Sequence, residues 1–336
     1  MAFWKNRKVL VAGGGGFIGS HLVERLASSG AMVTVPTRNS AKAMSNLQNC
    51  MGKIRIINAD LSSIDDCRRV AHGVDIIFNL AGKVGGIGYQ VGHHGTAYLS
   101  NVLVNLALLE AARLEGVERY QCTSSTCVYS RENSANAREE DAFVNDPEPT
   151  VFGYGWAKRM AEIQARLYAE EYGMKIAIVR PANTFGPRDD FSEQTSHVIP
   201  AIIARVFESD ESITIWGSGN QTRSFVYVQD VVRGMMDATE KYAIADPINL
   251  GSDEEVTIRD LVHSIIRLFG KKLDVRFDSA RPQGQPRKYA DIAKARRAIG
   301  WAPSFTLEQG LAKTISWYKE NVEDLSRSGV TYTSQQ

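Results

Sequence analysis

Cysteine is scarce in this sequence, and long apolar runs are absent. The chain has only four cysteines, at positions 50, 67, 122 and 127, and no two of them form a CxxC pair. Such spacing does not suggest a zinc site or a disulfide framework, and free thiols are typical of a reducing compartment. No stretch reaches the ~18 apolar residues of a transmembrane helix. We therefore expect a cytoplasmic protein without a metal site.

An excess of charge of either sign is also missing. Lys and Arg number 39 against 38 Asp and Glu, which gives a formal net charge of +1. No overall field then attracts nucleic acid or an anionic membrane, so any anionic ligand must be met by local cations. The apolar share of 43% and the charged share of 23% exclude collagen-like, disordered and coiled-coil classes for the whole chain.

Short apolar runs alternate with helical patterns through the first half of the chain. The runs predict strands at residues 8–12, 31–35, 54–58, 75–80, 120–124 and 175–180. The helical patterns cover residues 17–29, 97–115 and 154–172. Continuous apolar strands in this alternation predict an α/β fold with a doubly wound, Rossmann-type parallel sheet.

After Arg180 this rhythm changes, and the pattern predicts a smaller α+β lobe that binds substrate. Its expected strands are residues 213–216, 224–228 and 273–277, and its expected helices are 196–208, 257–268 and 307–320. We assign residues 1–183 and about 224–250 to the dinucleotide-binding domain. Residues 184–223 and 251–325, approximately, form the discontinuous substrate lobe, and 326–336 form a frayed tail. The polar, acidic segment 131–151 is expected to be a long surface loop and a candidate lid.

Three glycines lie directly between the first strand and the first helix. Gly13, Gly16 and Gly19 permit a tight turn and let backbone N–H groups approach a pyrophosphate at the helix N-terminus. The spacing fits both GxxGxxG and, from Gly14, GxGxxG, so it does not identify the subclass. The strand before it and the helix after it make the pattern specific for a dinucleotide site.

The end of the second strand bears on the choice of cofactor. An acid there would bind the ribose 2′-OH of NAD, but this chain has none and instead carries Arg38, which can pair with the 2′-phosphate of NADP. NADP(H) is therefore favoured, and NAD(H) stays open. Asp60, after the third strand, is expected in the adenine pocket or as a helix cap. The remaining expected cofactor contacts are Phe17, Ile18, Leu61, Leu80, Ala81 and Pro181.

Tyr154 and Lys158 open a long helix at a spacing of four residues. This spacing places both side chains on one face. A neighbouring ammonium lowers the pKa of a phenol, which suits a tyrosine that moves a proton near neutral pH. Ser125 follows the fifth strand, at the sheet edge where ligands bind in such folds.

Together these motifs resemble the extended short-chain dehydrogenase/reductase family over about residues 7–320. The glycines, Ser125, Tyr154 with Lys158, and the segment 180–187 occur in the family's order. The resemblance implies catalytic Ser125, Tyr154 and Lys158, the last two also at the nicotinamide ribose, and nucleotide-linked sugars as substrates. It also implies a homodimer formed by the helices at 97–115 and 154–172. One departure is the Phe-Gly pair before Tyr154, where a proline is common.

Narrower stretches indicate a group within that family. Thr126 and Cys127 replace the carboxylates of the dehydratases, so dehydration is rejected. Segments 82–87, 196–200, 216–219 and 286–288 are similar to members that epimerise C3 and C5 of a GDP-4-keto-6-deoxyhexose and reduce C4 with NADPH. By this resemblance Cys127 and His197 are the base and the acid of the epimerisation. A thiol and an imidazole titrate near enough to neutrality for these roles.

A nucleoside diphosphate needs cations in an otherwise neutral protein. The candidates are Arg205, Arg223, Arg281 and Lys288, for each of which a solvated surface role stays open. The other expected substrate contacts are Lys83, Gly86, Asn183 and Trp216.

Three alternatives remain. One is a related epimerase or reductase that acts on another nucleotide-linked deoxy sugar or on a heptose. Segments 86–90 and 217–225 are similar to redox-neutral 3,5-epimerases of the GDP-mannose type, which hold NAD tightly. Those members carry a lysine in place of His197 and an acid at the end of strand two, and both differences favour the reductase. An NADP-binding regulator without turnover is opposed by the complete set of Ser125, Tyr154 and Lys158.

Overall fold

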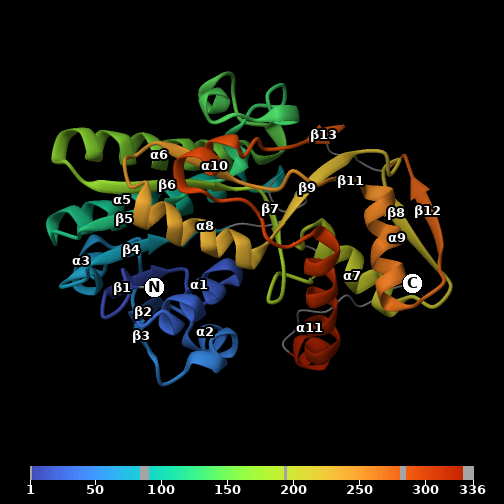
Figure 1. The fold of residues 1–336 in the computed structure, drawn as a ribbon, viewed down its shortest axis with the longest axis horizontal. Helices are drawn as coiled ribbons and strands as arrows, with labels where there is room; N and C mark the ends of the chain where they lie inside the picture. The colour runs from blue at the N-terminus through green and yellow to red at the C-terminus, as the bar shows by residue number, and fades with distance from the viewer. Residues whose placement is uncertain (1, 84–90, 193–194, 281–284, 328–336) are drawn as a thin grey trace.

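The structure, a computed structural model, describes residues 2–83, 91–192, 195–280 and 285–327. Figure 1 shows a larger part built on one sheet and a smaller part beside it, which contains α7, α9 and α11. In the described residues no helix is both long enough and apolar enough to cross a membrane.

The larger part contains a seven-stranded sheet in the order β10-β6-β5-β4-β1-β2-β3. Every neighbouring pair is parallel, which confirms the predicted doubly wound α/β fold. The strands are β1 (Lys8–Ala12), β2 (Met32–Thr37), β3 (Ile54–Asn58), β4 (Ile76–Asn79), β5 (Arg119–Thr123), β6 (Lys175–Pro181) and β10 (Pro247–Leu250).

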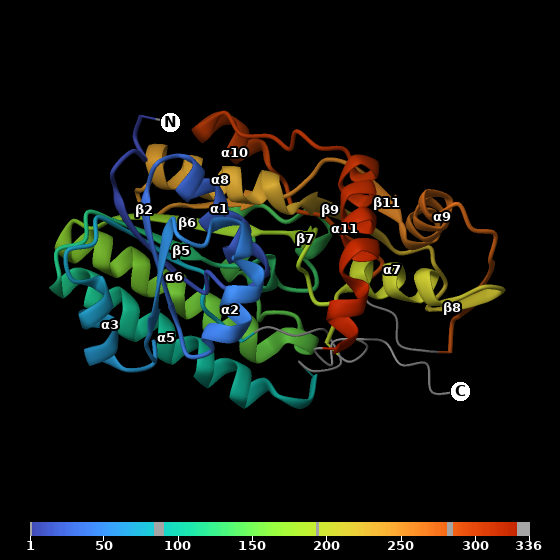
Figure 2. The same cartoon turned by 90° about the horizontal axis from the view of Figure 1, so that it is seen from below.

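Helices cover both faces of this sheet because successive strand residues point to opposite sides. Val9 and Val11 of β1 pack in one cluster with α1 and α8, whereas Leu10 and Ala12 pack with α3, α5 and α6. Figure 2 shows α5 and α6 on one side of the sheet and α8 on the other. These helices are α1 (Phe17–Ser28), α2 (Ser40–Asn46), α3 (Ile64–Ala71), α5 (His94–Leu114), α6 (Phe152–Tyr172) and α8 (Val228–Lys241).

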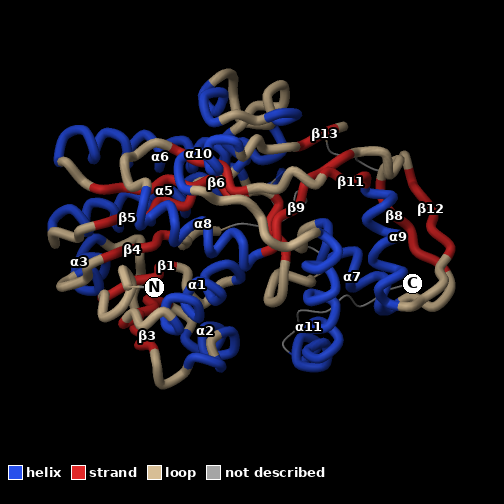
Figure 3. The backbone as a smooth tube through the Cα atoms, in the orientation of Figure 1, coloured by secondary structure: helices blue, strands red, loops and turns tan. Residues whose placement is uncertain are grey.

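The smaller part holds two short sheets. One joins β11, β9 and β13, with β7 also paired to β9, and the other joins β12 and β8 (Figure 3). The strands are β7 (Asn183–Phe185), β8 (Ser212–Trp216), β9 (Thr222–Tyr227), β11 (Glu255–Thr257), β12 (Asp274–Asp278) and β13 (Arg287–Lys288). The helices are α7 (Val198–Glu208), α9 (Ile258–Phe269), α10 (Ala293–Ile299) and α11 (Leu307–Arg327). We keep the domain boundaries given above as a proposal.

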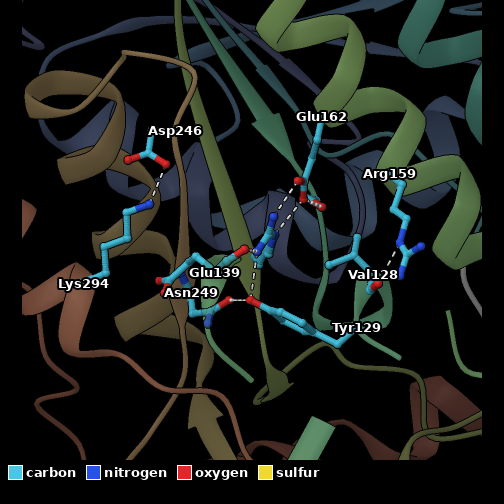
Figure 4. Close-up of polar contacts among 10 residues, drawn as sticks. Val128, Tyr129, Glu139, Arg159, Glu162, Asp246, Asn249 and Lys294 are labelled. Atoms are coloured by element: carbon cyan, nitrogen blue, oxygen red, sulfur yellow. Dashed lines mark hydrogen bonds and ion pairs between the residues drawn. The ribbon is translucent and has the colours of Figure 1, made fainter. Parts of the chain in front are cut away.

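A buried ion pair joins α6 to β6 next to the sheet edge. The two carboxylate oxygens of Glu162 accept hydrogen bonds from Arg180 Nε and Nη2, at 2.8 and 2.6 Å. Both side chains are at most 1% exposed. Arg180 Nη1 also donates to the Tyr129 hydroxyl and to the Glu139 carbonyl, both at 2.9 Å, as Figure 4 shows. The guanidinium thus ties together a helix, a strand and two loops.

The segment at residues 131–151 has many exposed residues, as expected of a surface loop, but it is also pinned to the protein. Its short 3₁₀ turns are Ser134–Asn136, Glu139–Phe143 and Pro149–Val151. The Glu139 carboxylate accepts from the Asn249 backbone N–H at 2.8 Å, and burial raises its pKa. The Ala137 N–H donates to the Tyr289 carbonyl at 2.9 Å. These fixed anchors are unlike those of a free lid.

Glu162→Gln should destabilise the protein by about 3–5 kcal/mol, because it leaves the buried Arg180 cation without a counter-charge. Urea unfolding measures the loss. The matched control is Glu110→Gln, which removes a bidentate partner of Arg113 at a partly exposed i,i+3 pair. A much smaller loss is expected there because solvent screens that pair. Equal losses in the two variants would contradict the assignment of a special role to the buried pair.

Candidate active site

A cleft of about 1900 Å³ lies between the two parts of the molecule. Its floor is formed by the carboxyl ends of β1, β5 and β6, and its other wall by residues of α7, β8 and β9. The side chains expected to be catalytic, namely Ser125, Cys127, Tyr154, Lys158 and His197, all line this one cleft.

The glycine turn at the start of α1 is tightly packed and open to the cleft. Gly13 has φ +77°, and a Cβ there would lie 2.7 Å from the Leu80 carbonyl carbon. A Cβ at Gly19 would overlap the Gly13 carbonyl oxygen. No side chain caps the N-terminus of α1 at Gly16, so its first amides are available to an anion. Of the expected cofactor contacts, Gly13, Gly16, Phe17, Ile18, Gly19, Leu80 and Pro181 line the cleft. These residues fit a dinucleotide pyrophosphate.

Other expected cofactor residues lie away from the cleft lining. These are Arg38, Asp60, Leu61 and Ala81. The Arg38 side chain is 75% exposed, with Nη1 3.8 Å from Asp60 Oδ1. Hydrogen bonds from the Ser62 N–H and hydroxyl are the main reason that the pKa of Asp60 is lowered, and Arg38 adds to the effect. Asp60 therefore shapes the turn before α3, but Ser63 caps that helix, so the alternative expectation of a helix cap at Asp60 is wrong.

Tyr154 and Lys158 are both buried at the floor of the cleft. Tyr154 is hydrogen-bonded to Ser125, whose Oγ also accepts from the Cys127 N–H at 3.1 Å. Lys158 Nζ lies 5.5 Å from the centroid of the Tyr154 ring, and it donates to the Thr123 carbonyl at 2.7 Å. The geometry brings serine, tyrosine and lysine together around one point.

The expectation that Lys158 lowers the pKa of Tyr154 is wrong for this structure. Burial raises the pKa of Tyr154 well above its usual value, Cys127 raises it further, and the hydrogen bond with Ser125 only partly offsets the rise. Burial also lowers the pKa of Lys158. Removal of water from the site is the largest cause of this rise, and Lys158 is not among its causes, so Tyr154 keeps its proton at neutral pH.

Helix α6 makes hydrogen bonds on both sides of Cys127 to the catalytic loop, by which we mean residues 124–128 after β5. On the strand side, the Ser124 hydroxyl donates to the Glu162 carboxylate. Beyond Cys127, Arg159 Nε donates to the Val128 carbonyl at 2.9 Å, a contact drawn in Figure 4. The helix that carries the tyrosine and lysine therefore also sets the position of the serine and the thiol.

His197 approaches from the opposite wall, directly before α7. Its side chain is 49% exposed, and its Nδ1 lies 3.5 Å from Asp189 Oδ1. The cleft thus places a thiol and an imidazole, from different parts of the fold, around the same space.

Cations gather on the wall formed by the smaller part. Arg223 and Lys288 are register partners on the adjacent parallel strands β9 and β13, so two like charges face each other. Such a pair is unfavourable unless an anion lies between the charges. Arg205 of α7, Asn183 and Trp216 line the same cleft. Desolvation lowers the pKa of Arg223, which Glu148 partly offsets.

One of the other expected substrate contacts lies away from the cleft lining. Lys83 is not among the residues that line the cleft, and its carbonyl accepts from Asn101 Nδ2 at 3.1 Å. Gly86 and Arg281 lie outside the described residues.

A group of hydrogen bonds between α1 and the segment after β7 was not predicted from the sequence. His21 Nε2 donates to the Pro187 carbonyl at 2.8 Å, and its Nδ1 accepts from Arg188 and Gln229 at 2.7 and 3.0 Å. Arg188 also holds both carboxylate oxygens of Glu24 at 2.8 Å. Burial first, and then the charge of Arg188, lower the pKa of His21 to about 4.

Glu162 and Asp189 were also missed. Glu162 could have been found, because it follows Tyr154 and Lys158 at spacings of eight and four on the same helical face. The contact of Asp189 with His197 crosses a turn, and no periodicity in the sequence signals it.

Comparison with known proteins gives consistent matches over nearly the whole chain. Residues 9–251 match the model of the NAD dependent epimerase/dehydratase family. GDP-mannose 3,5-epimerase 1 of Oryza sativa subsp. japonica is 30% identical over 98% of this chain and 86% of the relative. A dTDP-4-dehydro-6-deoxy-D-allose reductase of Streptomyces is 32% identical over 94% and 97% of the respective chains. A GDP-L-fucose synthase of Sinorhizobium fredii is 30% identical over 95% and 97%.

Solved structures share the fold. An epimerase of Methanothermobacter thermautotrophicus superposes with a TM-score of 0.87 at 29% identity, covering 97% of this chain and 96% of that one. A UDP-glucose 4-epimerase of Thermotoga maritima, with UDP-glucose, has a TM-score of 0.83 at 27% identity and covers 94% and 99% of the chains.

Acidification should destabilise the protein through His21. Above its unfolded pKa of about 6.5 the imidazole is neutral in both states. Between about pH 6.5 and pH 4 the imidazole is protonated in the unfolded chain but stays neutral in the folded protein. The free energy of unfolding therefore falls by about 3 kcal/mol as pH falls through this range. Urea unfolding across this range should show a shallower pH dependence for His21→Gln than for the wild type. His263→Gln, at an exposed position on α9, is the control; a wild-type slope in His21→Gln would refute the buried neutral state.

Proposed function

Since this chain belongs to the NAD dependent epimerase/dehydratase family, we propose that it epimerises C3 and C5 of a GDP-4-keto-6-deoxyhexose and reduces C4 with NADPH. The family membership makes the chain an NAD(P)-dependent nucleotide-sugar epimerase/reductase of the extended short-chain dehydrogenase/reductase type. The main support for this specific reaction is that one cleft is lined by Ser125, Tyr154 and Lys158 and also by Cys127 and His197.

Epimerisation relies on the acidity that a C4 ketone gives to the hydrogens on C3 and C5. Each inversion requires a base to remove a proton on one ring face and an acid to return one on the other. We assign these parts to Cys127 and His197, which reach the cleft from opposite walls.

Reduction at C4 requires a proton on the carbonyl oxygen as the hydride arrives. When bound, NADPH supplies that hydride. Burial keeps Tyr154 protonated, so its hydroxyl is ready to donate to the C4 oxygen, with Ser125 hydrogen-bonded beside it.

The cations on the opposite wall suit the diphosphate of the substrate. Arg223 and Lys288 face each other across two strands, and Arg205 lines the same cleft. Charge-assisted hydrogen bonds from such groups are the strong contacts with phosphate oxygens. Some relatives act on GDP-linked and others on dTDP-linked sugars, so our choice of GDP rests on the sequence motifs alone.

A second candidate is the redox-neutral 3,5-epimerisation of GDP-mannose with tightly bound NAD. GDP-mannose 3,5-epimerase matches slightly more of this chain than GDP-L-fucose synthase does, the reverse of the order expected from the motifs. We rank it second because His197 occupies the position of that enzyme's lysine and because Arg38 takes the place of its acid.

We also propose a homodimer through α5 and α6. These two helices pack against each other and leave apolar side chains exposed, including Leu99, Leu103, Leu106 and Leu167. An exposed apolar face of this kind is typical of an interface between subunits. The mass in solution, measured by light scattering, distinguishes one chain from two.

The direct test supplies purified protein with NADPH and GDP-4-keto-6-deoxymannose. Loss of NADPH absorbance that depends on the sugar is expected, with C3 and C5 both inverted in the product. No loss with this sugar, together with conversion of GDP-mannose without added cofactor, would overturn the first candidate and support the second.

Cys127→Ser should separate the two reactions, because hydride transfer needs Tyr154 and Lys158 but not the thiol. Incorporation of solvent deuterium at C3 and C5 should fall by about 10²-fold or more, while some direct reduction remains. Cys50→Ser, at a buried thiol that donates to the Leu47 carbonyl, serves as the control for loss of a cysteine. Equal losses of exchange and reduction in Cys127→Ser would count against separate roles.

Arg38→Ala should weaken NADPH binding by about tenfold to a hundredfold and leave NADH binding unchanged. The reason is loss of one charge-assisted contact to the 2′-phosphate. Titration of cofactor fluorescence measures both affinities. Arg68→Ala, which breaks a surface pair with Glu115, is the matched control; an unaltered preference in Arg38→Ala removes this residue from cofactor selection.

A further inference from the structure

Residues 186–190 connect the cofactor-binding helix α1 to the wall that carries His197. Arg188 anchors this segment through its two hydrogen bonds to Glu24 and its contact with His21. Its backbone has φ +68°, a left-handed conformation that is unfavourable for a residue with a side chain. These contacts hold the backbone in that conformation and thereby fix where the next residue, Asp189, directs its carboxylate.

The Asp189 carboxylate is buried but incompletely paired. The residue is 6% exposed. Its Oδ1 accepts from the Asp190 N–H at 2.8 Å and lies 3.5 Å from His197 Nδ1. Its Oδ2 is buried and has no hydrogen-bond partner among the described residues. An unpaired buried carboxylate oxygen destabilises the fold, so this group needs an explanation other than stability.

The charges around His197 favour its protonated form. The groups that face it are Asp189 and Asp190 from the same segment and Lys288 from β13. Partial removal of water opposes a charge on the ring, and so does Lys288. The hydrogen bond to Asp189 and the charges of both aspartates outweigh these effects and raise the pKa of His197.

We propose that Asp189 is the positioning residue for His197: it fixes the imidazole through Nδ1 and leaves Nε2 to donate a proton to the sugar ring. This inference rests on the proposed function of His197 as the acid of the epimerisation. In that step the Nε2–H bond breaks as a C–H bond forms at the ring carbon. On the other ring face the Cys127 thiolate takes up the proton that leaves the carbon. The neutral ring keeps its Nδ1–H toward Asp189; Nε2 then takes a proton from solvent and the thiol returns one to solvent, so both groups are restored.

Asp189→Asn tests this without any substrate. Each variant is titrated by NMR with isotope-labelled histidine, and the His197 signal is assigned by its absence in His197→Gln. The expected result is a fall in the pKa of His197 of about one unit or more, because a facing carboxylate shifts a partner by roughly that amount. The conservative Asp189→Glu should restore most of the wild-type titration.

The matched control is Asp190→Asn, at the neighbouring carboxylate. Its oxygens accept from the Ser192 N–H and from the Thr195 hydroxyl, so its hydrogen bonds hold the local turn and it acts on the imidazole through its charge alone. A clearly smaller change in the titration of His197 is expected there. A fall as large as that in Asp189→Asn would contradict a specific role for Asp189.

Kinetics provide the second readout. The protonated ring is the active form of an acid, so exchange of solvent deuterium into the sugar should decline as pH rises through the pKa of His197. In Asp189→Asn this decline should move to lower pH by the shift seen in the titration, with NADPH affinity unchanged. An unchanged titration in a folded Asp189→Asn protein overturns the inference. A shifted titration, combined with no exchange by the wild type on any GDP- or dTDP-linked 4-ketosugar, supports the positioning role and refutes the proposed function.

Discussion

The buried pair of Glu162 and Arg180 is the constraint on which the site depends. A guanidinium and a carboxylate that are both shielded from water must stay paired, since separating them exposes an uncompensated charge to the protein interior. The pair joins α6 to β6, and Glu162 also accepts from Ser124 at the end of β5. Helix, strand and catalytic loop therefore cannot shift independently, and the serine and thiol keep a fixed relation to the tyrosine.

The wall of the cleft formed by the smaller part of the molecule is held in place differently. Its functional groups are polar side chains on short strands and turns, held by local contacts rather than by the large sheet. Arg223 and Lys288 are like charges at paired positions of neighbouring strands, and Asp189 Oδ2 has no hydrogen-bond partner in the part of the chain that the structure describes. Such unfavourable arrangements persist where a charged ligand or a proton transfer uses them. The cleft thus combines a floor that is fixed by the buried ion pair and carries Tyr154 and Lys158 with a wall whose charged side chains suit a charged ligand.

Much of the fold was predictable because each long element carries one pattern; β1 and β3 have the bounds that the apolar runs indicate. Strands of two or three residues, such as β13 and β7, have too few residues for any period to be visible. The omission of α8 was avoidable, since Val228, Val231, Val232 and Met235 follow helical spacing and all are buried. For the site, spacing placed Tyr154 beside Lys158 correctly on one helix. It could not predict the desolvation that reverses the expected pKa shift, because desolvation depends on distant parts of the chain.

The several duties of α6 have an evolutionary consequence. This helix supplies Tyr154 and Lys158, anchors the catalytic loop through Arg159 and Glu162, and packs against α5 along its length. Few of its positions are open to neutral drift, so natural variation that adapts the enzyme to another sugar should accumulate elsewhere. The wall formed by α7, β8 and β13 lines the cleft and carries none of Ser125, Tyr154 and Lys158. Substitutions in that wall can therefore change the substrate while the residues assigned to hydride transfer stay the same.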